Sequence, residues 1–144
     1  METQTPITIT KEYRWEMGHR LAAHAGHCRN LHGHSYRAVV ALTGHAGENG
    51  MVLDFAEVTE AVRPIIDSLD HATMLQDSDE PLTGMLCSLG LKVVSVPFTP
   101  TTEELCRWML GEIAGGLKAR GAAGTLALTI HETSTSTVTM SQRL

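Results

Sequence analysis

Hydrophobic and polar residues alternate along residues 6–20, and this segment is rich in β-branched and aromatic side chains. A period of two is typical of a strand with one buried face. A second stretch of this kind spans about 34–43. The residues between them, 21–31, follow neither a strand nor a helical period and contain Gly26 and Asn30, so we expect a loop. The first third of the chain therefore predicts two strands joined by a loop.

Helical spacing follows in two later segments. Apolar residues recur every three or four positions over 52–71, which predicts a helix with one buried face. Pro64 should bend this helix or begin a new turn, because proline has no backbone N–H. A second helix should begin after Thr101, which lies three residues before Glu104 in the spacing of a capping box, and should end near Gly121.

The remaining segments complete the order of elements. Residues 72–90 look irregular, 91–98 predict a short strand, and 125–133 with 135–143 alternate like the two arms of a closing hairpin. The order β-β-α-(β)-α-β-β favours an α+β fold with an antiparallel sheet over a parallel one. With 144 residues and no linker, residues 1–144 should form a single domain.

Composition excludes several classes of protein. Hydrophobic residues make up 42% of the chain, but no apolar run approaches the roughly 20 residues that a membrane span requires. The N-terminus does not resemble a secretory signal, which predicts a cytoplasmic protein. The net charge is −5 and no long basic run is present, so we do not expect nucleic-acid binding. Three cysteines without a regular spacing argue against a disulfide scaffold.

Charge is nevertheless unevenly distributed. Residues 11–37 contain five Lys or Arg and two Glu, a net charge of +3, whereas the rest of the chain totals −8. Such an asymmetry can draw a small anion to one side of an acidic protein. A scatter of solvated arginines explains the pattern equally well.

Histidine is concentrated in the same region, where five of the eight fall within residues 19–34. His32 and His34 flank Gly33, and side chains two apart in a strand point to the same face. A hairpin would bring His19, near the end of the preceding strand, beside this pair. Three imidazoles and one open position are the arrangement of a catalytic zinc site. Cys28 lies four residues before His32, and its thiol is either a base near the metal or a fourth ligand that closes the site.

Several segments together resemble the 6-pyruvoyltetrahydropterin synthase family, over nearly the whole chain. The most specific is CRNLHGHSY, which runs from Cys28 to Tyr36. The others are Trp15–Leu21, Gly50–Phe55, Leu69–His71, Pro100–Glu103 and Glu132–Thr133. The gap of three residues between Cys28 and the H-G-H is similar to the bacterial branch of this family, which makes 6-carboxytetrahydropterin for queuosine.

This resemblance implies a role for ten side chains and one Zn²⁺ per subunit. The implied zinc ligands are His19, His32 and His34, the implied base is Cys28, the implied catalytic relay is Asp70 with His71, to which Glu132 is sometimes added, and the implied pterin contacts are Thr101, Thr102, Glu103 and Glu132. A carboxylate suits pterin binding, because it can accept two parallel N–H bonds from the aminopyrimidine edge of the ring.

The resemblance also implies an assembly and a reaction. The family fold is a tunnelling fold (T-fold), a ββααββ unit whose antiparallel sheets join into a barrel in a trimer, and two trimers stack into a hexamer with active sites between subunits. The implied enzyme is a zinc-dependent lyase that converts 7,8-dihydroneopterin triphosphate to 6-carboxytetrahydropterin, acetaldehyde and triphosphate. Two alternatives remain open: a related lyase, such as 6-pyruvoyltetrahydropterin synthase, on the same substrate, and a non-catalytic zinc-binding module.

Overall fold

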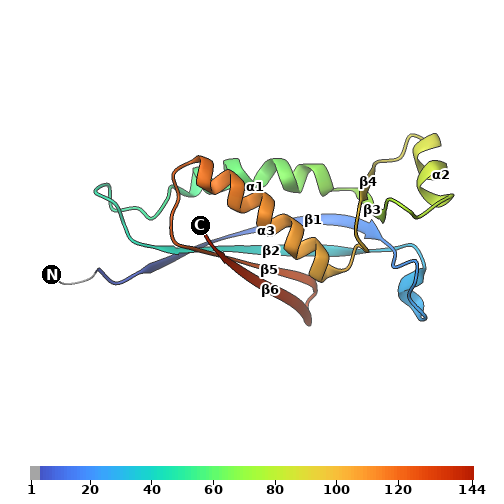
Figure 1. The fold of residues 1–144 in the computed structure, drawn as a ribbon, viewed down its shortest axis with the longest axis horizontal. Coiled ribbons are helices and arrows are strands. Elements are labelled where there is room, and N and C mark those ends of the chain that lie inside the picture. Colours follow the sequence, from blue (N-terminus) through green and yellow to red (C-terminus); the bar gives the residue numbers. More distant parts are fainter. Residues whose placement is uncertain (1–3) are drawn as a thin grey trace.

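The protein, a computed structural model, is described over residues 4–144, and within them six strands form one sheet (Figure 1). The strands are β1 (Ile7–His19), β2 (His32–Gly44), β3 (Ala72–Gln76), β4 (Val93–Val96), β5 (Thr125–Thr133) and β6 (Ser136–Arg143), in the spatial order β4-β3-β1-β2-β5-β6. The helices are α1 (Phe55–Leu69), α2 (Leu82–Ser88) and α3 (Thr102–Ala119), and a 3₁₀ turn, η1 (His27–Arg29), lies between β1 and β2.

The α+β class is as the sequence predicts, and both arms of each predicted hairpin are antiparallel neighbours. The prediction of an antiparallel sheet is wrong at one edge, where β3 runs parallel to β1 and β4 runs parallel to β3. The prediction that residues 72–90 are irregular is also wrong, because this range contains β3 and α2. Ala72, Met74 and Leu75 are all buried, so β3 has no alternation for a sequence pattern to detect.

The two long helices lie together on one side of the sheet, here called the helix face (Figure 1). Alternate residues of the central strands, such as Trp15 on β1 and Ala38 on β2, are buried beneath them. The residues in between point to the opposite side, called the open face, where the side chains are polar or small. Among the described helices, none is long and apolar enough to cross a membrane.

Side-chain caps position both long helices. Asp54 accepts the N–H of Ala56 at 2.8 Å, so α1 begins at Phe55 and continues through Pro64 as a single helix. Thr101 accepts the N–H of Glu104 at 3.2 Å and begins α3, as its spacing in the sequence predicts. Each cap pairs an N–H group that has no partner within its helix. The second cap also fixes the position of Thr102, the first residue of α3, which lines a cavity of the candidate site.

Candidate functional site

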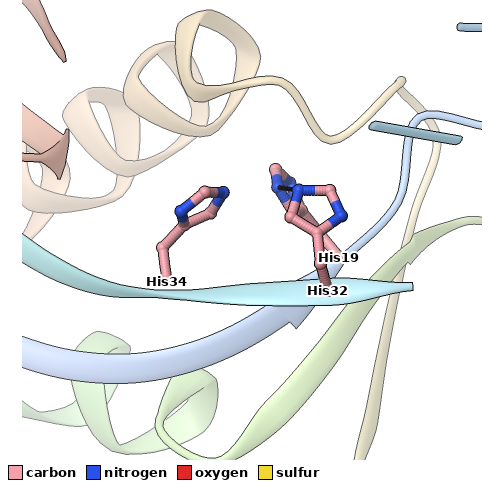
Figure 2. Close-up of side chains that lie close together, drawn as sticks. All are labelled: His19, His32 and His34. Carbon is pink, nitrogen blue, oxygen red and sulfur yellow. Dashed lines mark hydrogen bonds between the residues drawn. The ribbon is translucent and has the colours of Figure 1, made fainter. Parts of the chain in front are cut away.

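The three histidines of the cluster come from the adjoining ends of β1 and β2. In the antiparallel register His19 lies opposite His32, and Met17 lies opposite His34, so all three imidazoles reach the helix face. Their ligand nitrogens lie within 4.8 Å of one another. Figure 2 shows the rings gathered on one side of β2. The convergence expected from the spacing of these histidines is therefore present in the fold.

Two backbone carbonyls fix the orientation of His19 and His32. Nδ1 of His19 is 2.8 Å from the carbonyl oxygen of Pro100, and Nδ1 of His32 is 2.7 Å from that of Asn30. A carbonyl oxygen can only accept, so each Nδ1 carries the proton and each Nε2 presents a lone pair. These two Nε2 atoms are 3.1 Å apart. Two facing lone pairs repel each other unless a proton or a cation lies between them.

The electrostatics of the cluster favour a metal over a proton. Burial lowers the pKa of His19 more than its hydrogen bond to Pro100 raises it, so the ring is neutral near pH 7. The Nε2 atom of His34 is buried and has no hydrogen-bond partner within residues 4–144. Nitrogens on a tetrahedral zinc ion lie about 3.3 Å apart, given Zn–N distances of about 2.0–2.1 Å. Three imidazoles whose ligand nitrogens lie this close together fit Zn²⁺ with one coordination position left open.

The Cys28 thiol lies outside the group of ligand atoms that converge among the described residues. Cys28 is half-buried on η1, and its carbonyl accepts the N–H of Leu21 at 2.8 Å, which closes the loop between the two strands. This placement keeps the thiol at the same end of the hairpin as the histidines. It matches a three-histidine site better than a site closed by cysteine.

A second group of the candidate residues lines a cavity of about 390 Å³ beside the histidines. The Thr102 hydroxyl donates a short hydrogen bond to Oε2 of Glu132, and Oε1 of the same carboxylate is 3.7 Å from Nε2 of His34. The fold thus brings the implied pterin contacts together although Thr102 and Glu132 lie 30 residues apart in the sequence. The cavity is lined by Leu21, Thr101, Thr102, Glu103, Glu132, Ser136, Thr137 and Val138.

Sequence reasoning missed part of this lining. Ser136 and Thr137 look like ordinary strand residues, and only the pairing of β6 with β5 places them at the cavity. Tyr36 is buried beside His34 and stacks on Trp15 with ring centroids 5.1 Å apart. Burial, with a further contribution from the Glu132 carboxylate, raises the pKa of Tyr36, so the phenol stays protonated. The sequence did contain a signal for Tyr36: it lies two residues after His34 in the same strand, so its side chain should point to the same face as the histidines.

Asp70 and His71 lie elsewhere, on the open face. Oδ1 of Asp70 accepts the N–H of Glu16 at 2.9 Å and lies 3.0 Å from Nδ1 of His71. The hydrogen bond from Glu16 is the main reason why the pKa of Asp70 is lowered. His71 has a positive φ of 60°, and its side chain is 78% exposed. The pair has the geometry of a carboxylate that orients an imidazole, but within one chain the sheet separates it from the three histidines.

Comparison with known proteins gives a consistent result. Residues 8–143 match the family model of 6-pyruvoyl tetrahydropterin synthase. A 6-carboxy-5,6,7,8-tetrahydropterin synthase of Haemophilus influenzae is 34% identical over 113 residues, covering 73% of this chain and 80% of that protein. One from Synechocystis is 33% identical over 134 residues, covering 89% and 88%. The crystal structure of 6-pyruvoyl tetrahydropterin synthase from Plasmodium vivax shares the fold, with a TM-score of 0.78 at 21% identity over 98% of this chain and 100% of that one.

Proposed function

The chain belongs to the 6-pyruvoyl tetrahydropterin synthase family, and we propose that it is a zinc-dependent lyase acting on 7,8-dihydroneopterin triphosphate. The products are 6-carboxy-5,6,7,8-tetrahydropterin, acetaldehyde and triphosphate, with one water consumed. The comparisons confirm the family and the lyase class that the sequence predicted. The observation that carries the zinc assignment is the pair of Nε2 lone pairs of His19 and His32, 3.1 Å apart, beside the Nε2 of His34, which has no hydrogen-bond partner among the described residues.

His19, His32 and His34 would hold the metal through their Nε2 atoms. Bound there, Zn²⁺ would polarise the side-chain hydroxyls of the substrate and make the adjacent carbinol C–H more acidic. The carbonyls of Pro100 and Asn30 keep two of the rings in the required tautomer.

Glu132 anchors the pterin in this proposal. Its carboxylate accepts N–H bonds from the aminopyrimidine edge, and the Thr102 hydroxyl holds one of the carboxylate oxygens in place. Thr101 and Glu103 border the same cavity, and the exposed opening at Ser136 and Thr137 leaves room for a planar ring. The ring is thereby positioned so that its side chain extends toward the histidines.

In this proposal Cys28 and the Asp70–His71 pair transfer the protons of the reaction. The Cys28 thiolate removes the carbinol proton, and His71, oriented by Asp70 through Nδ1, relays a proton through Nε2. Asp70 and His71 lie on the open face, whereas His19, His32 and His34 reach the helix face, and in this proposal a second copy of the chain supplies the Asp70–His71 pair. A homotrimer or homohexamer with active sites between subunits supplies it, and this assembly is part of the proposal.

The same proposal places the enzyme in the cytoplasm and its product in queuosine biosynthesis. The curated relatives named above support the 6-carboxy branch over a 6-pyruvoyl product. A non-catalytic zinc module is the weaker alternative, because it would require a closed site, and the Cys28 thiol lies outside the converging ligands.

The proposal is tested by incubating the zinc-loaded protein with 7,8-dihydroneopterin triphosphate, identifying the pterin by mass spectrometry and assaying acetaldehyde separately. Carboxypterin with acetaldehyde supports the proposed lyase. A pyruvoyl product would move the enzyme to the other branch, and unreacted substrate with zinc bound would favour the binding module. Zinc content should fall in His32→Ala and be retained in His24→Ala, a matched exposed histidine outside the cluster.

A further inference from the structure

The peptide group that joins Asp70 to His71 is held at both of its polar ends. Its N–H, which belongs to His71, donates to the carbonyl oxygen of Glu16 at 2.6 Å. Its carbonyl oxygen, which belongs to Asp70, accepts a hydrogen bond from Nζ of Lys92 at 2.8 Å. A peptide group is planar, so two bonds at opposite ends fix its orientation. Glu16 lies on β1 and Lys92 directly precedes β4, so two distant segments of the chain hold this one group.

Lys92 also replaces a hydrogen bond that α1 loses at its end. In a continuing helix the N–H of His71 would donate to the carbonyl of Asp67, four residues earlier. That N–H donates to Glu16 instead, and Nζ of Lys92 donates to the carbonyl of Asp67 at 2.7 Å. The last turn of α1 contains no basic residue of its own. A cation from elsewhere in the chain therefore pairs the free carbonyls and complements the negative end of the helix dipole.

The pairing of two parallel strands brings Lys92 to this place. His71 directly precedes β3, Lys92 directly precedes β4, and the two strands are parallel neighbours (Figure 1). Neighbouring parallel strands begin at the same edge of a sheet. The N–H of Thr73 donates to the carbonyl of Lys92 at 3.0 Å. The fold thus anchors the backbone of Lys92 to β3, and the side chain reaches back to the end of α1.

His71 needs such support because its backbone conformation is unfavourable. Its φ of 60° lies in the left-handed region, which residues other than glycine rarely adopt. A conformation of this kind persists where the surrounding contacts over-determine it. The peptide group held by Lys92 sets the direction of the His71 side chain, whose Nδ1 lies 3.0 Å from Oδ1 of Asp70. Rotation of that peptide would move the imidazole away from the carboxylate and from the cavity that His71 borders.

We propose that Lys92 is a positioning residue for His71 and keeps the imidazole in the orientation in which it relays a proton. This inference rests on the proposed function for the role of His71. Lys92 is not among the residues that line the cavity beside His71, so it acts through the backbone rather than by touching the substrate. Its ammonium group binds the two carbonyls and takes part in no ion pair among the described residues.

The kinetic test replaces Lys92 by methionine, which keeps the aliphatic stem and removes the charge and the donors. Lys92 is exposed, so this change leaves the core intact. On zinc-loaded protein, Lys92→Met should lower kcat about tenfold at constant KM, because a misplaced group loses part of the ~10²–10⁴-fold that positioned proton transfer contributes. Lys92→Arg retains a cation with donors and should recover most of this loss. Lys118→Met is the matched control, an exposed lysine in the last turn of α3, and should keep the kcat of the unaltered protein.

A crystal structure of Lys92→Met provides a measurement that does not depend on activity. Nδ1 of His71 should lie beyond hydrogen-bond distance of the Asp70 carboxylate in this variant. An unchanged kcat, or a His71 that keeps its position, would overturn the inference. A raised KM at constant kcat would also overturn it, because Lys92 would then be a substrate contact. Failure of the proposed function gives a different result: the unaltered protein then shows no turnover, while the crystal structure still reports whether Lys92 holds His71.

Discussion

Replacing Thr102 by valine removes one hydroxyl and keeps the shape of the side chain. Thr102 is buried, and its hydroxyl donates to Oε2 of Glu132. A hydrogen bond to a charged group contributes about 1.5–3 kcal/mol, and each 1.4 kcal/mol is a factor of ten in affinity. The Glu132 side chain is 27% exposed, so water can replace part of the lost bond, and the lower end of this range applies. We therefore expect the KM for the pterin substrate to rise about tenfold in Thr102→Val.

Steady-state kinetics on zinc-loaded protein measures this effect, with Thr102→Ser as the control that retains the hydroxyl. The zinc content should be the same in both variants, because neither change touches His19, His32 or His34. The serine variant should stay close to the unaltered protein. A valine variant whose KM is unchanged would refute the idea that Thr102 orients Glu132 for the pterin, and loss of zinc would show that the two parts of the site are coupled.

Three further predictions concern protons, salt and pH. Cys28→Ala should abolish turnover and retain zinc, and cobalt-substituted protein should lack a strong thiolate charge-transfer band; loss of zinc from this variant would instead make the thiol a ligand. The KM for the triphosphate substrate should rise with ionic strength, because salt screens the basic side chains, and a flat dependence would contradict an electrostatic contribution. The lowered pKa of Asp70 stabilises the fold above its ordinary unfolded pKa of about 3.9, and this contribution is lost as the pH falls through the folded value. Thermal unfolding of Asp70→Asn should thus differ from the unaltered protein at pH 6, and the difference should shrink as the pH falls below the ordinary aspartate pKa towards the lowered folded value. A difference that stays constant with pH would argue against the linkage.

The patterns that succeeded in the sequence are local ones. Alternation along residues 6–20 predicted β1, and the two-residue spacing of His32 and His34 predicted that both rings share a face. The relation of Thr101 to Glu104 predicted where α3 begins. In each case the geometry of one strand or one helical turn, repeated along the chain, is enough to place a side chain.

The features that failed or stayed hidden depend on contacts between distant segments. β3 is buried on both sides and therefore shows no period, and its parallel pairing with β1 follows from the path of α1 across the sheet. The carbonyls of Pro100 and Asn30 fix the histidine tautomers, but a backbone carbonyl has no signature in the sequence. Thr102 and Glu132 meet across 30 residues only because α3 packs on β5.

Residue type and short-range spacing were enough to predict the class of fold, the histidine cluster and the types of side chain available for chemistry, because each of these can be read from a single segment. The tertiary structure alone decided that His19 reaches His32, that Asp70 and His71 lie across the sheet from them, and that Lys92 reaches the carbonyl of Asp70. These relations depend on strand register and on which face of the sheet the helices cover. Both are set by the burial of the whole core, which no single segment encodes.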